Sequence, residues 1–515
     1  MSTENHIYNT KRGGLPMNEK RKSGILLHPT SLPGKYGIGT LGREAYRFVD
    51  FLIVSRQSLW QVCPLGHTGY GDSPYQCFSA FAGNPLLIDL ECLVLRGFLT
   101  MNDIEEHSFT SEKVDYGKVI KWKFPILKKA FERFKCEKKV RENAKFQNFI
   151  FKNKDWLDDY ALFMSLKDKF GGKAWFTWDE DIRLRKHDAL EHYKKELADE
   201  IMFYQFLQYI FSEQWLELKA YANRNFIQII GDIPLYIAAD SSDAWASPEL
   251  FLLDDKTGLP QKVAGVPPDY FSATGQLWGN PIYRWDYMKA NGFKWWIKRI
   301  EANLHWADIL RLDHFRGLCA FWQVPYGEET AINGEWKQAP GSELFEALQK
   351  TFGNIPILAE DLGVITEDVV ALREKYNLPG MKILQFAFDS EEASSKTFFP
   401  HVYDKNCAVY TGTHDNDTVH GWYNAAKDID KKMADKYLGI KNKNMLHYDF
   451  IRAAWASTAN IAVAPMQDLL GKGSEARMNL PGSASGNWQW RFKWDDLTSE
   501  HEEFLAEITA LYGRL

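Results

Sequence analysis

Short runs of apolar residues recur along the chain, and each run ends in a polar or glycine-containing loop. Continuous runs of this length are typical of strands that are buried on both faces, as in a parallel sheet. Helix-like segments such as Ser342–Phe352 and Glu367–Tyr376 separate several of the runs. The eight runs are Gly24–His28, Leu59–Leu65, Phe226–Asp232, Asp308–Asp313, Ile355–Glu360, Lys382–Phe388, Cys407–Thr413 and Ile461–Gln467. Eight β-then-α units predict a (β/α)8 TIM barrel of the α/β class.

The spacing of the runs predicts insertions into this barrel after its second and third strands. The second and third runs are far apart, and the intervening residues, about 66–222, are largely helical in pattern. The gap before the fourth run predicts a second insertion, an aromatic loop at about 240–300. Residues 1–22 are polar and are expected to form an N-terminal extension. The remaining residues, 23–515, are then expected to form one catalytic barrel that carries both insertions, although length alone predicts about three domains.

Composition narrows the class of protein. The chain has 515 residues, of which 45% are hydrophobic and 25% charged, and this excludes collagen-like, disordered and disulfide-scaffold proteins. A net charge of -6 argues against a nucleic-acid partner, and no apolar stretch approaches the ~20 residues of a membrane span. The six cysteines show no CxxC spacing, and the N-terminus shows no signal peptide, so we expect a cytoplasmic protein. The 19 tryptophans are unusual, and we expect many of them to face a groove.

Acidic residues stand at the ends of three predicted strands. Asp313 ends the fourth run, Glu360 ends the fifth, and Asp415 follows the seventh. In a TIM barrel these ends converge on one mouth, where the active site lies. A single acid at such a position is usually a helix N-cap, but three together favour chemistry. Two carboxylates that flank a bond, one ionised and one protonated, are what glycoside cleavage requires.

Neighbouring residues indicate which carboxylate is ionised. Arg311 precedes Asp313 by two positions, so both side chains leave the same face of the strand, and the guanidinium favours the charged carboxylate. Asp313 is therefore the predicted nucleophile. Glu360 follows an apolar run with no cation beside it in the sequence, and desolvation raises the pKa of such a group, which suits a general acid/base. Asp415 is predicted to stabilise the positively charged transition state or to hold sugar hydroxyls.

A metal site is the alternative interpretation of the same strand ends. His28, His314 and His414 lie near the predicted mouth with acids beside two of them. None of them has HxH or HExxH spacing, and each can equally donate a hydrogen bond to a hydroxyl. The sequence therefore favours a site without metal.

Three loops combine amides, acids and aromatic rings. They are Gly265–Tyr283, Gly69–Gln76 and Asn479–Arg491. The first is too rich in proline and glycine for a helix or a central strand, so its aromatic residues are predicted to lie in a loop. Rings above a barrel mouth suit the C–H faces of sugars. Packing of the loop onto the barrel is the alternative, and we expect it for about half of the rings.

The segments that carry these residues resemble the 4-alpha-glucanotransferases of glycoside hydrolase family 77, the amylomaltases or disproportionating enzymes. The resemblance runs from Ser23 nearly to the C-terminus, and GVPPDYFSATGQLWGNPIY is its most specific part. The matching segments are Ser23–Gly34, Gly71–Gln76, Gly231–Ala238, Gly265–Tyr283, Arg311–Gly317, Ala359–Gly363, Gly412–Thr418 and Pro481–Arg491. It implies an interrupted barrel without a C-terminal β-domain.

The resemblance also implies an activity. It implies transfer of α-1,4-glucan segments from starch-like glucans or maltooligosaccharides to a glucose or oligosaccharide acceptor, with retention and without a cofactor or metal. Asp313 falls at the position of the nucleophile, Glu360 at that of the acid/base and Asp415 at that of the third catalytic acid. The other matching positions are those of two flanking catalytic-site residues, Arg311 and His414, and of four glucan contacts, Tyr75, Asp269, Trp278 and Asn280.

The carboxylate pattern by itself does not distinguish transfer from hydrolysis, because sugar and water can both complete the second step. Transfer requires that water is excluded while an acceptor is kept in a shaped site. A retaining α-glucan hydrolase of the amylase type, and a non-catalytic glucan-binding barrel, therefore remain alternatives. The three acids argue against the binding protein, since a protein that only binds glucan has no need of all three.

Overall fold

The computed structural model describes residues 20–515, apart from 106–107, 137–139, 269–271, 392 and 484. Most of the expected N-terminal extension, residues 1–19, lies outside the described residues. The last residue of that expected extension, Lys22, is the first residue of β1.

Eight parallel strands form the centre of the molecule, as predicted, in the order β10-β11-β12-β1-β2-β3-β6-β9. The strands are β1 (Lys22–Leu26), β2 (Leu59–Gln61), β3 (Gln228–Ile233), β6 (Ile309–Leu312), β9 (Ile357–Ala359), β10 (Gly380–Ile383), β11 (Cys407–Tyr410) and β12 (Ile461–Pro465). The N–H of Ala359 at the end of β9 donates to the carbonyl of Pro379 beside β10 at 2.9 Å. This contact joins the two outermost strands, so the sheet closes into a barrel.

The strands are short and buried on both faces, which explains their continuous apolar sequences. All five residues of β12 are buried, as are all four of β6 and of β11. Close approach between strands requires a glycine at one point. A Cβ on Gly24 of β1 would lie 2.1 Å from the carbonyl oxygen of Leu59 in β2, so a larger residue there would force these two strands apart.

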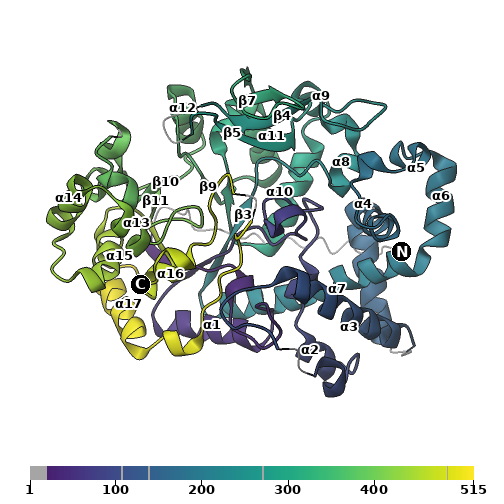
Figure 1. The fold of residues 1–515 in the computed structure, drawn as a ribbon, viewed down its shortest axis with the longest axis horizontal. Helices are drawn as coiled ribbons and strands as arrows, with labels where there is room; N and C mark the ends of the chain where they lie inside the picture. Colours follow the sequence, from purple (N-terminus) through teal and green to yellow (C-terminus); the bar gives the residue numbers. More distant parts are fainter. Residues whose placement is uncertain (1–19, 106–107, 137–139, 269–271, 392, 484) are drawn as a thin grey trace, which may run out of the picture.

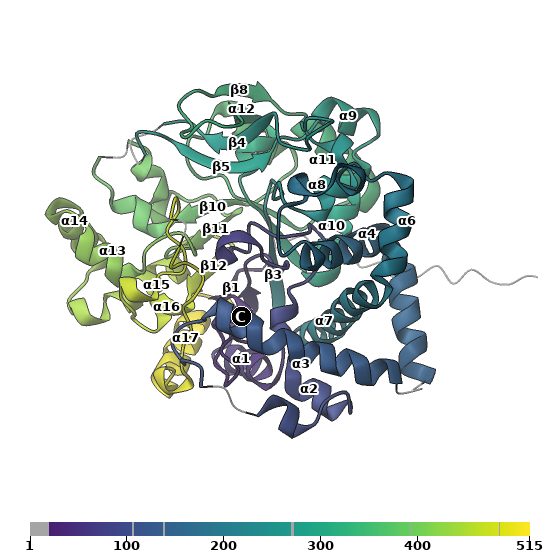
Figure 2. The same cartoon turned by 45° about the vertical axis from the view of Figure 1, so that its right-hand side comes forward.

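Helices occupy most of the chain between β2 and β3. In Figure 2 they form the right-hand side of the molecule, beside the barrel strands. Helices α4 and α7 pack against each other, and the apolar residues of α7 contribute much of the core there. These helices are α2 (Leu90–Leu95), α3 (Tyr116–Cys136), α4 (Val140–Lys169), α5 (Glu180–Arg183), α6 (His187–Glu196) and α7 (Ala198–Arg224).

The other helices precede β2 or follow β3. They are α1 (Arg43–Val54), α8 (Ser242–Ala246), α9 (Trp285–Ala290), α10 (Lys294–Trp306), α11 (Gly341–Phe352), α12 (Glu367–Lys375), α13 (Val419–Ala425), α14 (Asp428–Leu438), α15 (Leu446–Ala456), α16 (Met466–Leu469) and α17 (Ser499–Leu511). In the described residues no strand follows β12, in agreement with the expected lack of a C-terminal β-domain. No helix in the described ranges has the length and apolar character needed to cross a membrane.

A second, antiparallel sheet of four strands lies beside one end of the barrel, at the top of Figure 1. Its order is β5-β4-β7-β8, from β4 (Lys262–Val266), β5 (Gln276–Pro281), β7 (Ala320–Pro325) and β8 (Glu335–Gln338). The prediction that Gly265–Tyr283 is a loop is therefore wrong for β5 and for the end of β4. Because β5 is an edge strand, it tolerates Pro281, and Gly279 adopts a φ of 77° there.

The sixth predicted run also differs from the observed element. Strand β10 begins before Lys382 and ends at Ile383, and Leu384–Phe388 forms a 3-10 helix instead of strand. Leu384 and Phe388 pack into a separate apolar cluster with residues of α13, α14 and α15. An apolar run does not reveal where a strand ends when the next turn is buried as well.

Candidate active site

The register of three neighbouring strands brings the strand-end acids together. Asp232 of β3 is paired with Arg311 of β6, and Leu312 of β6 is paired with Ala359 of β9. Asp313 and Glu360 occupy the next positions along β6 and β9, so they stand side by side at a strand spacing of about 4.8 Å. The backbone N–H of Glu360 donates to the carbonyl of Leu312 at 3.1 Å and continues the pairing to this point.

Arg311 joins two of the carboxylates. Its guanidinium is 4% exposed, and its Nη1 lies 2.9 Å and 2.8 Å from the two oxygens of Asp232 and 2.9 Å from Oδ1 of Asp313. The ion pair with Asp313 is the one that the two-residue spacing predicts. The side chain of Asp232 is buried as well, so one buried cation joins a buried carboxylate to the partly exposed carboxylate of Asp313.

Asp313 combines burial with access to the mouth. Burial raises the pKa of Asp313, the charge of Arg311 lowers it, and the charges of Asp232 and Asp415 raise it again. The side chain still exposes 26% of its surface, so the carboxylate can meet a ligand directly. The net pKa of Asp313 is raised to about 6, and the charge of Arg311 is the largest influence that opposes burial and favours an ionised Asp313.

Of the two neighbouring carboxyl groups, Glu360 has the more strongly raised pKa. Burial raises its pKa, Arg311 acts in the opposite sense, and Asp313 raises the pKa further; the net rise exceeds that of Asp313. Its Oε2 accepts the backbone N–H of His314 at 2.7 Å, and Oε1 accepts that of Leu362 at 3.1 Å. His314 presents its N–H from a left-handed conformation with a φ of 51°, a strain typical of functional sites. Of the two carboxyl groups, Glu360 therefore has the stronger tendency to be protonated.

Asp415, which follows β11, forms an ion pair with His414. Its Oδ2 lies 3.3 Å from Nε2 of His414, and its Oδ1 accepts a hydrogen bond from Nδ2 of Asn479 at 2.6 Å. Burial disfavours the charge, yet His414 and Asn479 hold the pKa of Asp415 well below its usual range. Burial likewise lowers the pKa of His414, but Asp415 outweighs it and the net pKa is raised. Asp415 is thus ionised at neutral pH.

Aromatic rings line the same region. The ring of Tyr75 stacks on His414 with centroids 5.1 Å apart, and its hydroxyl donates to Oδ2 of Asp232 at 2.8 Å. Trp488 packs against both Tyr75 and His414. Trp278 meets His314 edge to face with centroids 4.8 Å apart. The predicted contacts Tyr75 and Trp278 therefore adjoin the acids.

The other two predicted glucan contacts are Asn280 and Asp269. Asn280 is 5% exposed, its Nδ2 donates to the carbonyl of Ile237 at 2.7 Å, and its Oδ1 accepts from Gln76 at 3.2 Å. Its amide is thus hydrogen-bonded within the protein. Asp269 lies outside the described residues.

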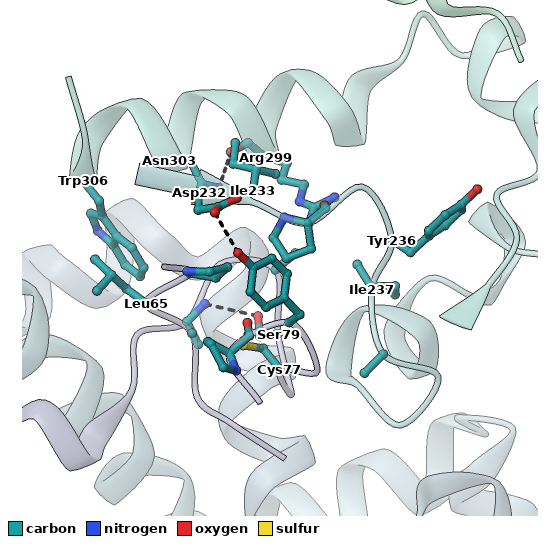
Figure 3. A pocket seen from close by; sticks show the side chains of 18 residues that line it. Leu65, Cys77, Ser79, Asp232, Ile233, Tyr236, Ile237, Arg299, Asn303 and Trp306 are labelled. Carbon is teal, nitrogen blue, oxygen red and sulfur yellow. Dashed lines mark hydrogen bonds between the residues drawn. The ribbon is translucent and has the colours of Figure 1, made fainter. Parts of the chain in front are cut away.

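A small cavity adjoins Asp232 and Tyr75 behind the mouth. Its volume is about 40 Å³, and Ser79, Arg299 and Trp306 are among its lining residues (Figure 3). This is space for a few water molecules and not for a sugar ring.

The alternative of a metal site has no matching cluster. Within the described ranges no three or more His, Cys, Asp or Glu side chains are grouped so that they could hold a metal ion. His28 is buried, and burial lowers its pKa to about 3, which leaves the imidazole neutral.

Comparison with known proteins shows to which family of barrel proteins the chain belongs. The family model of the 4-alpha-glucanotransferases, glycoside hydrolase family 77, matches residues 27–498. The chain belongs to this family. Among family members, the 4-alpha-glucanotransferase of Synechocystis sp. is 51% identical over 97% of this chain and 99% of its own length. The 4-alpha-glucanotransferase of Thermus thermophilus is 49% identical over 97% of this chain and its own full length.

Solved structures agree with this family assignment. An amylomaltase from Streptococcus agalactiae, in complex with acarbose, has a TM-score of 0.93 and 43% identity, and the match covers 96% of this chain and 100% of that one. The amylomaltase from Corynebacterium glutamicum has a TM-score of 0.78 at 16% identity, over 96% of this chain and 75% of that one, and it shares the fold.

Sequence reasoning missed several residues that contact the candidate site. Asp232 ends the third predicted strand, and the strand-end criterion that identified the other acids would have found it. Asn479 and Trp488 lie in a loop that the sequence marked as aromatic and amide-rich, but nothing in that loop indicates contact with His414 or Asp415. Arg477, whose Nη2 donates to the carbonyl of Asp415 at 2.5 Å, gives no sequence signal.

Proposed function

We propose that the protein is a retaining 4-alpha-glucanotransferase that works by double displacement. The observation that carries the proposal is the adjacent pair Asp313 and Glu360, in which Arg311 favours an ionised Asp313 while burial keeps the proton on Glu360. Two carboxyl groups in opposite protonation states are the requirement for cleavage of a glycosidic bond.

In the first step, the Asp313 carboxylate attacks C1 of the donor glucosyl unit. The bond from C1 to the bridging oxygen breaks, and Glu360 gives its proton to that oxygen, so the leaving glucan departs with a free 4-hydroxyl. The product is a glycosyl ester on Asp313. The Asp415 anion stabilises the positive charge that develops on the ring, and His414 holds that anion in place.

In the second step, the ionised Glu360 removes the proton from the 4-hydroxyl of an acceptor. The acceptor oxygen attacks C1, the ester to Asp313 breaks, and the new α-1,4 bond forms with the original configuration. At the end of this step Glu360 is protonated again and Asp313 is again a free carboxylate. No metal or cofactor takes part in either step.

The substrates that we propose are α-1,4-glucans and maltooligosaccharides as donors, with glucose or a maltooligosaccharide as acceptor. The bound acarbose of the Streptococcus agalactiae amylomaltase supports this class, because that relative is 43% identical over 96% of this chain. We propose that Tyr75 and Trp278 contact the glucan, since their rings adjoin His414 and His314. Asp269 and Asn280 remain predicted contacts. A cytoplasmic location remains a prediction, and the 43% identical relative from Solanum tuberosum is named chloroplastic or amyloplastic.

Incubation with maltotriose tests transfer directly. A transferase converts it into glucose and a ladder of longer maltooligosaccharides, while the total number of reducing ends stays constant. Chromatography of the products and a reducing-sugar assay follow both quantities. A hydrolase would give only shorter sugars with a steady rise in reducing ends, and a binding protein would leave maltotriose intact; either result would contradict the proposal.

A further inference from the structure

Asp468 lies just past the eighth barrel strand, in α16, and it contacts none of the four carboxylates at the mouth. Its side chain is buried, with 2% of the residue exposed. Its Oδ2 accepts the hydroxyl of Thr411 at 2.6 Å, and its Oδ1 accepts the backbone N–H of Val419 at 2.7 Å. One carboxylate thus binds two points that are eight positions apart in the sequence.

Those two points are the ends of the segment that carries the His414–Asp415 ion pair. Thr411 is the first residue after β11, and Val419 is the first residue of α13. Inside the segment, Asn416 accepts hydrogen bonds from the N–H and the hydroxyl of Thr413 at 2.9 Å and 2.8 Å. The internal bonds shape the segment, and Asp468 attaches both of its ends to α16.

We infer that Asp468 is a positioning residue for the reaction, because it holds the segment 411–419 so that the His414–Asp415 pair stays aligned over the reacting sugar. The inference rests on the proposed role of Asp415. Asp468 makes one hydrogen bond to each end of the segment, and hydrogen bonds to a carboxylate are among the strong ones. When both are lost, the two ends of the segment are no longer attached to α16, and the bonds that still hold it include those within it and those from Gln385, Arg477 and Asn479. A displacement of about 1 Å in a catalytic group can cost about 100-fold in rate.

The test compares steady-state kinetics of five variants on maltotriose, per mole of folded enzyme. Asp468→Ala removes both contacts, and we expect kcat to fall about 10- to 100-fold while KM changes less than about twofold. Asp468→Asn keeps an oxygen for Val419 and an amide for Thr411, so we expect it to restore kcat to within about threefold of the wild type. Thr411→Val removes one contact at nearly constant volume and is expected to give an intermediate kcat.

Asp89 provides a matched control. It is also buried, and it accepts a threonine hydroxyl, from Thr40 at 2.7 Å, and an amide of a helix first turn, from Cys92 at 2.9 Å. It lies next to α2, and its side-chain partners Thr40 and Cys92 are outside the segment 411–419. Asp89→Ala should lower the melting temperature as Asp468→Ala does, but leave kcat per folded enzyme unchanged.

Three results would overturn the inference. The first is a wild-type kcat in folded Asp468→Ala, and the second is an equal loss of kcat in Asp89→Ala. The third applies if Asp468→Ala does not fold: Thr411→Val is then measured in its place, and an unchanged kcat in that variant would overturn the inference. Asp415→Asn serves as the reference: a wild-type kcat there would refute the proposed role of Asp415 itself, whereas a large loss there with no effect at Asp468 would refute this inference alone.

Discussion

Replacing Arg311 with methionine removes the cation that Asp232 and Asp313 share. Nη1 of Arg311 lies 2.8 Å and 2.9 Å from these two carboxylates, and its side chain is 4% exposed, so water does not replace it. A hydrogen bond to a charged group is worth about 1.5–3 kcal/mol, and one pKa unit corresponds to 1.36 kcal/mol. Burial already raises the pKa of Asp313, and loss of the cation should raise it by a further one to two units, roughly.

The assay is kcat/KM for maltotriose as a function of pH. A higher pKa leaves less of Asp313 ionised at a given pH, so the acid limb of the Arg311→Met profile should move up by about one to two pH units. At a pH on the wild-type acid limb this shift lowers kcat/KM about 10- to 100-fold. Arg311→Lys, which keeps the charge, should move the limb less. If the acid limb of the folded methionine variant coincided with that of the wild type, Arg311 would not control the ionisation of Asp313.

Three further predictions concern Glu360, Lys123 and the metal-site alternative. Glu360→Gln should bind maltooligosaccharides as the wild type does, by calorimetry, but lose most turnover of maltotriose; normal turnover would refute the acid/base role. Lys123 is fully buried, and burial lowers its pKa to about 7, below the unfolded value. Between pH 7 and 10 the unfolded chain therefore holds the extra proton, and relative to Lys123→Met the wild type should gain up to about 1.4 kcal/mol of unfolding free energy per pH unit, measured by denaturant titration. A pH-independent difference would contradict this. Prolonged treatment with a strong chelator should leave the transfer rate unchanged, and its loss with restoration by a divalent metal would revive the metal-site alternative.

The barrel could be predicted from the sequence because its strands are buried on both faces. Such strands are continuous apolar runs, and each of the eight runs overlaps an observed barrel strand. The second sheet could not be predicted in the same way. All four residues of β8 are exposed, and β5 contains Gly279 and Pro281, so neither strand has an apolar run. These strands are held by pairing with β4 and β7, which connects parts of the chain that the sequence pattern does not link.

The candidate site could be predicted only where neighbours in the sequence are also neighbours in space. The pairing of Arg311 with Asp313 follows from a two-residue spacing on one strand, and the structure has it at 2.9 Å. The bonds of Asp415 to Asn479 and of Asp232 to Arg311 join different strands or loops, and no local pattern encodes them. The protonation of Glu360 falls between these cases, because its burial was predictable but the charge of Arg311 acting on it from another strand was not.

The central claim is that Asp313 becomes covalently attached to the sugar, and trapping tests it most directly. An α-maltotriosyl fluoride donor releases fluoride without help from an acid, whereas Glu360→Gln cannot activate the acceptor, so the intermediate should accumulate in this variant. Mass spectrometry of the digested protein should place one maltotriosyl unit on the peptide that contains Asp313, and Asp313→Asn in the same background should abolish it. Attachment to another residue, or rapid turnover of the fluoride without any adduct, would contradict the account.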